Sequence, residues 1–146
     1  MTPETHIADI TRLIQLAVAP VFLLTAIGTI IGVLSGRLGR AVDRRRVLED
    51  RLRQLAPEAQ GSVRAELELL ARRVRLVYAS IALAVFSALF VGMLIAAAFV
   101  DAFLAVSLSQ FIGLLFIAAM LAFIASLVVF LREIFLAVTG SGGRIH

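Results

Sequence analysis

Polar and small side chains recur along one face of the first apolar stretch of the chain. Their 4-3 spacing places them on a single stripe of a helix. In hydrocarbon, glycine lets helix backbones approach closely, while threonine and glutamine form hydrogen bonds between helices or line a polar conduit. The stripe consists of Thr11, Gln15, Val18, Phe22, Thr25, Thr29, Gly32 and Gly36, and Gly28 forms a glycine zipper with Gly32 and Gly36.

Two partners for this stripe remain open. The second apolar stretch carries small residues at similar spacing, which offers a partner within one chain. A second copy of the first helix is the other partner, and on balance we expect a homo-oligomer. The small residues of the second stretch are Ser80, Ala84, Ser87, Ala88 and Gly92.

Charged residues flank the first stretch on both sides. Asp9 and Arg12 precede it, and Arg37, Arg40 and Arg44 follow it. If copies of the first helix surround an axis, these residues form rings of charge at an outer and an inner mouth, as in simple pores. In a monomer they are only interfacial anchors. The centres of the apolar stretches hold no ionisable residue, which argues against a proton-coupled transporter or a voltage sensor.

Pro20 lies inside the first stretch. Proline removes one backbone hydrogen bond from a helix, so we expect a hinge or kink at this position. The alternative is a tolerated membrane proline whose neighbours satisfy the freed carbonyl.

The residue types argue against catalysis. The chain has no cysteine, and its histidines, His6 and His146, lie at opposite ends. No glycine-rich phosphate loop is present. We therefore expect no enzyme activity, no catalytic residues, no cofactor and no metal site. The arginines alternate with acidic residues rather than with aromatic ones, so we also expect no nucleic-acid binding.

Three uncharged stretches define the elements that carry these residues. They cover 13–36, 76–100 and 102–131, and each is long enough to cross about 30 Å of hydrocarbon. Mean hydropathy is +1.02, and 61% of residues are hydrophobic. The sequence predicts an all-α integral membrane protein, a single membrane domain over 1–146 with spans at about 12–36, 76–100 and 108–131.

The distribution of arginine predicts the orientation of the spans. All fourteen basic residues are arginine, and eleven of them fall in 37–75, between the first two spans. By the positive-inside rule this segment is cytoplasmic, with the N-terminus outside and the C-terminus inside. We expect its arginines to contact the bilayer and its anionic headgroups. Residues 132–146 then form a short, mobile cytoplasmic tail.

The segment 37–75 also has helical periodicity. Apolar residues repeat at 4-3 spacing on both sides of a break that contains Pro57 and Gly61, which predicts two antiparallel helices with facing apolar seams. No strong breaker separates the first span from Leu55, so we expect one continuous helix up to that residue. The seam residues are Leu48, Leu52 and Leu55, then Val63, Leu67, Leu70, Val74 and Val77.

Two segments carry a resemblance to a known family. They are Ile14-Gln15-Leu-Ala-Val-Ala-Pro20 and Arg37-x-x-Arg40-x-x-Asp43-Arg44. Through them the chain resembles an uncharacterised bacterial family of small three-span integral membrane proteins, a domain of unknown function. The resemblance covers essentially the whole chain and implies a bacterial cytoplasmic (inner) membrane. It implies no activity.

Two functional hypotheses remain. In the first, the chain is a homo-oligomeric ion channel or conduit lined by the first helix. In the second, it is a non-conducting scaffold or accessory subunit that recruits partners through its cytoplasmic hairpin. Burial of the Thr25 and Thr29 face within one chain would exclude the conduit, and a hairpin seam satisfied by its own chain would weaken the recruitment hypothesis.

Overall fold

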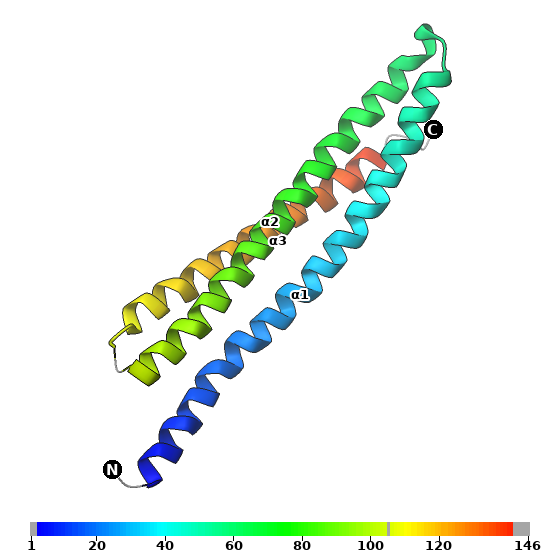
Figure 1. Ribbon diagram of the computed structural model, residues 1–146. Coiled ribbons are helices and arrows are strands. Elements are labelled where there is room, and N and C mark those ends of the chain that lie inside the picture. The colour runs from blue at the N-terminus through cyan, green and yellow to red at the C-terminus, as the bar shows by residue number, and fades with distance from the viewer. Residues whose placement is uncertain (1–2, 105, 142–146) are drawn as a thin grey trace. The chain divides into compact units, whose positions relative to one another are not determined.

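Three long helices make up the described part of the chain (Figure 1). The computed structural model describes residues 3–104 and 106–141, and side-chain surroundings for 7–104 and 106–139. Helix α1 covers Pro3–Gln54, α2 covers Gln60–Leu104 and α3 covers Ser109–Ser141, and a short 3-10 helix, η1, covers Pro57–Ala59. All three long helices are long and apolar enough to span a membrane, which confirms the all-α, three-span prediction.

Helix α1 is continuous from the first apolar stretch into the arginine-rich segment. It ends at Gln54, one residue before the predicted end. Pro20 lies inside this helix and is buried. The break that follows is stabilised by Gln60, whose side-chain amide donates to the carbonyls of Leu52 (3.3 Å) and Leu55 (3.0 Å). These are backbone acceptors that a helix end leaves without an intrahelical partner.

Helix α3 differs from the sequence prediction at its C-terminal end. We expected the third span to end near residue 131 and a mobile tail to follow. Instead α3 continues as a helix through Ser141. The chain there is Ile134-Phe-Leu-Ala-Val138, which is as apolar as the span itself. Arg132 and Glu133 therefore interrupt the run of apolar residues without ending the helix. The predicted tail residues 142–146 lie outside the described residues.

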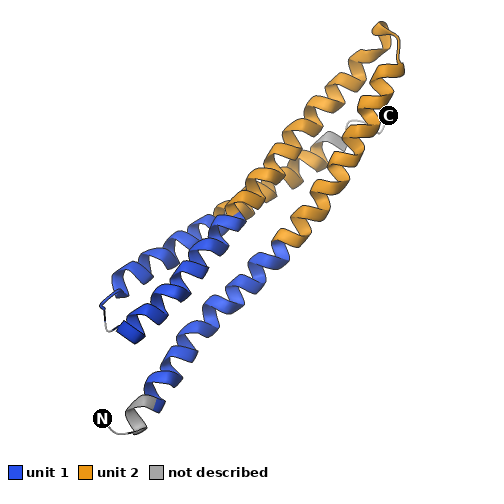
Figure 2. Cartoon of the chain, in the orientation of Figure 1, with its two compact units in different colours: residues 1–30, 84–124 blue, residues 31–83, 125–146 orange. Residues whose placement is uncertain are grey.

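The helices divide into two compact units, and each long helix contributes to both (Figure 2). Unit 1 contains residues 1–30 and 84–124. Its apolar core comprises Leu94, Ala97 and Leu115, with Phe90, Ile95 and Ile112 packed against them. The turn between α2 and α3 is held by Asp101, whose carboxylate accepts a hydrogen bond from the backbone N–H of Leu108 at 2.7 Å.

Unit 2 contains residues 31–83 and 125–146. Here α1 and α2 lie antiparallel on either side of the η1 turn (Figure 1). Four of the predicted seam residues, Leu48, Leu70, Val74 and Val77, are buried, and the other four, Leu52, Leu55, Val63 and Leu67, are partly buried. Arg44 of α1 also pairs with Glu66 of α2.

Candidate functional site: a three-helix ion cluster and an exposed helix face

The ion cluster of unit 2 consists of Arg37, Arg73 and Glu133, one residue from each long helix. The buried face of α3 explains the position of Glu133. Ala119 and Ser126 on this face are both 0% exposed, and Glu133 follows Ser126 by seven residues, which is two helical turns. The helix therefore directs the Glu133 side chain into the protein, where it is 2% exposed.

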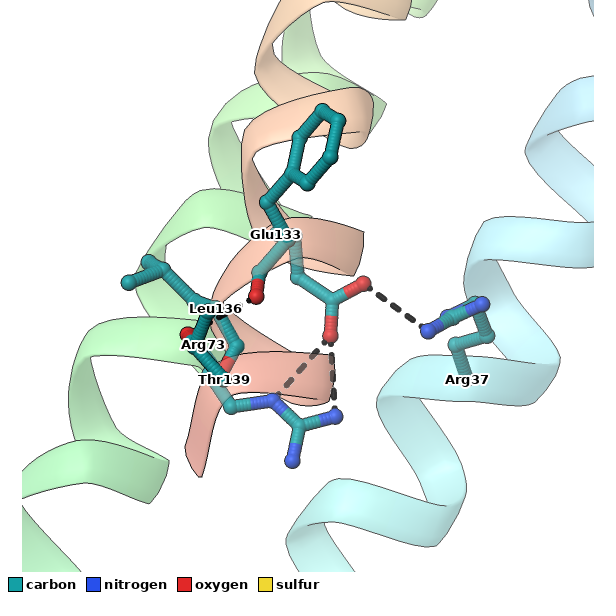
Figure 3. Close-up of polar contacts among 6 residues, drawn as sticks. Arg37, Arg73, Glu133, Leu136 and Thr139 are labelled. Carbon is teal, nitrogen blue, oxygen red and sulfur yellow. Dashed lines mark hydrogen bonds and ion pairs between the residues drawn. The ribbon is translucent and has the colours of Figure 1, made fainter. Parts of the chain in front are cut away.

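Both arginines face the Glu133 carboxylate (Figure 3). Arg73 donates to Oε1 through Nε at 3.2 Å and through Nη2 at 3.0 Å. Nη2 of Arg37 lies 3.1 Å from Oε2. Oε2 has no well-directed hydrogen bond within the described chain, so the Arg37 contact is an ion pair without hydrogen-bond geometry. Arg37 also lies over the ring of Phe130, 5.3 Å from its centroid, within range of a cation–π interaction.

The cluster joins all three helices at one level. A buried carboxylate is strongly disfavoured unless charged or hydrogen-bonding partners compensate for its lost hydration. Glu133 finds such partners only when α1 and α2 both supply their arginines. The side chains of Arg37 and Arg73 are 30% and 32% exposed, so each arginine contacts the buried carboxylate and also the surroundings of the protein.

This cluster was not predicted from the sequence. The sequence patterns predicted Arg37 in a ring at the inner mouth of a pore and Glu133 in the cytoplasmic tail. One signal was available: Glu133 continues the seven-residue spacing of Ala119 and Ser126 on α3. The sequence held no comparable signal for which arginines would be its partners.

The other predicted charged residues lie apart from this cluster. Asp9 and Arg12 are exposed on α1, as are Arg40 and Arg44. Arg44 is engaged by Glu66 across the hairpin. Whether any of these residues forms a ring at a pore mouth stays a prediction.

The predicted stripe of α1 is exposed along its whole length. Gln15, Thr25, Gly28, Thr29, Gly32 and Gly36 are all exposed, as are Thr11, Val18 and Phe22. A Cβ atom built at Gly28 or Gly32 would meet nothing within 4 Å. The stripe is therefore not buried by its own chain.

The threonine hydroxyls of the stripe are satisfied within α1. Thr25 donates to the carbonyl of Val21 at 3.2 Å, and Thr29 donates to the carbonyl of Thr25 at 2.9 Å. Thr11 does the same with Ile7 at 2.9 Å. Each hydroxyl thus uses its single donor inside the helix and keeps acceptor capacity.

The small residues of α2 pack on α3. Ser80 and Ser126 bond reciprocally, each hydroxyl donating to the other residue's carbonyl, at 2.7 and 2.8 Å. Ser87 donates to the carbonyl of Ala119 at 2.7 Å. Ser80, Ser87 and Ala84 are all 0% exposed. This part of the small-residue face of α2 is used within the α2–α3 interface, so it does not serve as the partner of the glycines on α1.

Unit 1 contains one further feature, an apolar groove of about 440 Å³ between α1 and α2. Its lining on α1 runs from Ile10 to Phe22, and Phe99 and Phe103 line it on α2. Among the described residues, no group of three or more His, Cys, Asp or Glu side chains is placed to hold a metal ion.

Comparison with known proteins gives one match. The family described as "Protein of unknown function (DUF2721)" matches residues 17–141. No curated protein and no solved structure matches the chain.

Proposed function

Because the chain belongs to this family of unknown function, which supplies no activity, we propose a function from its residues: a homo-oligomeric membrane protein whose α1 helices line an ion conduit. Three helices are too few to enclose a pore, so several copies would have to form it. By the positive-inside rule, the arginine-rich hairpin lies in the cytoplasm. A bacterial inner membrane is the location that the sequence resemblance implies.

The exposure of the α1 stripe carries this proposal. Ile27 and Leu34 on α1 are 0% exposed, so this helix uses one face to pack within its own chain. An α-helix turns by about 100° per residue. Thr25, two residues before Ile27, and Gly36, nine residues after it, therefore both lie close to the face opposite Ile27. The stripe is thus free to meet other copies of α1.

The chemistry of the stripe supports conduction. Its threonine hydroxyls donate their hydrogen bonds inside α1, and their oxygen atoms remain able to accept. Rings of oxygen acceptors replace the hydration shell of cations in selective pores. Gly32 and Gly36 would let neighbouring copies approach closely at the arginine-rich end of the stripe.

The recruitment hypothesis receives less support. It requires the apolar seam of the hairpin to be free for a partner. Leu48 is 4% exposed and Leu70 is 5% exposed, so these seam residues are already buried within the chain. We therefore favour self-association over recruitment through this surface.

Native mass spectrometry of the full chain in nanodiscs tests the proposal, with Gly32→Leu as the variant. Apart from the neighbouring backbone of α1 itself, a Cβ at Gly32 meets nothing within 4 Å, and Gly32 is exposed, so we expect leucine to fit without disturbing the monomer. Loss of an oligomer would therefore report on contacts between copies. Ala26→Leu is the matched control, because Ala26 is an exposed small residue of α1 that, six residues before Gly32 at about 100° per residue, points about 120° away from it.

We expect an oligomer of several copies for the wild type and for Ala26→Leu, and a monomer for Gly32→Leu. Liposomes should then show ion flux with wild-type protein and at least tenfold less with Gly32→Leu. A monomeric wild type, or equal oligomers in both variants, would exclude the proposal.

A further inference from the structure

We propose that Arg37 and Arg73 together bind the phosphate of an anionic membrane lipid, which serves as the second counter-anion of the ion cluster. This inference concerns a different surface from the α1 stripe and does not depend on oligomerisation. It rests on three features of the cluster: its excess positive charge, the arginine N–H groups that make no contact with Glu133, and its position at the ends of the apolar stretches.

The charge of the cluster is not balanced. Two guanidinium groups share the single carboxylate of Glu133, which leaves one positive charge in excess. Arginine stays protonated in proteins, so this charge cannot be removed by loss of a proton. A half-buried excess charge favours a second anion beside it.

The arginines retain donors for such an anion. Arg73 uses Nε and Nη2 on Oε1, and Arg37 uses Nη2 on Oε2. Within the described chain, Nη1 of each arginine makes no hydrogen bond or ion pair. About a third of each side chain is exposed, whereas Glu133 is 2% exposed. An approaching anion therefore meets the guanidinium groups and is kept from the carboxylate.

The position of the cluster along the helices identifies the anion as a lipid phosphate. Arg37 directly follows the uncharged stretch 13–36, Arg73 lies three residues before the stretch 76–100, and Glu133 lies two residues after the stretch 102–131. All three residues therefore lie where the hydrocarbon ends and the headgroups begin. Guanidinium groups form charge-assisted hydrogen bonds with phosphate, and anionic headgroups are the abundant phosphate at this level.

Native mass spectrometry of the full chain with phosphatidylglycerol and phosphatidylcholine tests the inference. Arg37→Gln and Arg73→Gln should each weaken phosphatidylglycerol binding by roughly fivefold, the effect of one arginine near an anionic surface. Arg132→Gln is the matched control. It removes the same charge at the same level of α3, but the Arg132 side chain is exposed and lies outside the cluster. We expect a change below about twofold for the control and for phosphatidylcholine.

Glu133→Gln separates lipid binding from a purely structural role. This variant removes the competing carboxylate and keeps both arginines, so phosphatidylglycerol should bind more tightly than to the wild type. A structural role alone would give weaker or unchanged binding in all three cluster variants. That result, or an equal loss in Arg132→Gln, would overturn the inference. Displacement of phosphatidylglycerol by excess inorganic phosphate would overturn the assignment to a lipid.

Discussion

Glu133 carries the only buried charge among the residues whose side chains are described, and its energetics follow from desolvation. The carboxylate has almost no contact with solvent, and its compensation comes from two arginines on two other helices. Removing one partner of such a group leaves an uncompensated charge, which costs more than the pair contributes. The exposed pair of Arg45 and Glu49, at 2.8 Å on one helix, contributes far less.

Glu133→Gln should lower the free energy of unfolding by about 2 kcal/mol. This value is below that for a fully buried pair, because both arginines keep partial contact with their surroundings. Unfolding in mixed micelles, followed by circular dichroism, measures it. Glu68→Gln is the control, since Glu68 is exposed on α2, and its effect should stay under about 0.5 kcal/mol. Equal effects of the two variants would contradict the proposed role of desolvation.

At the scale of the elements, α2 and α3 are joined by hydrogen bonds from buried serine hydroxyls to backbone carbonyls. Ser80 and Ser126 bring the two backbones together through reciprocal bonds, and Ser87 adds a second contact point. Small residues allow this approach, and hydroxyl groups stabilise it where no water competes. Helix α1 contributes large side chains instead, with Ile27 and Leu34 fully buried.

Substitutions at Ser126 should separate hydrogen bonding from packing. Ser126→Ala should cost about 0.6 kcal/mol, the average for such a bond in a membrane protein. Ser126→Leu should cost about 1–3 kcal/mol more, because the site has no room for a larger side chain. The same unfolding measurement applies. Gly92→Leu is the control and should be neutral, since a Cβ there meets nothing within 4 Å. A neutral Ser126→Leu would exclude a close α2–α3 contact.

Much of the element pattern could be predicted from the sequence. The hydrophobic periodicity located the three helices and the buried seam residues of the hairpin, and the Pro57 region located the break. The helical residues after Glu133 were predicted as a tail because charges such as Arg132 and Glu133 indicate where a span ends, but a helix can continue beyond the end of its span. The partner of the α2 small residues was also missed. Periodicity gives the face of a helix, but not which of two other helices covers it.

For the whole molecule, the sequence identifies the class of protein and predicts its orientation. Three helices long and apolar enough to span a membrane indicate a multi-pass membrane protein. The orientation rests on the concentration of arginine between the first two spans, which indicates the side of the membrane that holds the hairpin. The ion cluster could not be predicted without the folded arrangement, because its three residues are distant in the sequence: Arg73 and Glu133 are 60 positions apart.

Single cysteines test the orientation directly, since the chain contains none of its own. Ser62→Cys lies next to the hairpin turn and Ser107→Cys in the α2–α3 connection, and both serines are exposed. A membrane-impermeant maleimide should label Ser107→Cys on intact cells, and Ser62→Cys only after permeabilisation. Labelling in the opposite order would reverse the orientation.

The ion cluster also has a consequence for biosynthesis. Ribosomes add roughly 5–20 residues per second, so about 3–12 s pass between the synthesis of Arg73 and that of Glu133, 60 residues later. During this interval the nascent chain carries two arginines without their shared carboxylate. In a chain truncated before α3, Arg37 and Arg73 would never meet the Glu133 carboxylate. Helix α3, which is translated after α1 and α2, therefore supplies the carboxylate that the arginines of the two earlier helices share.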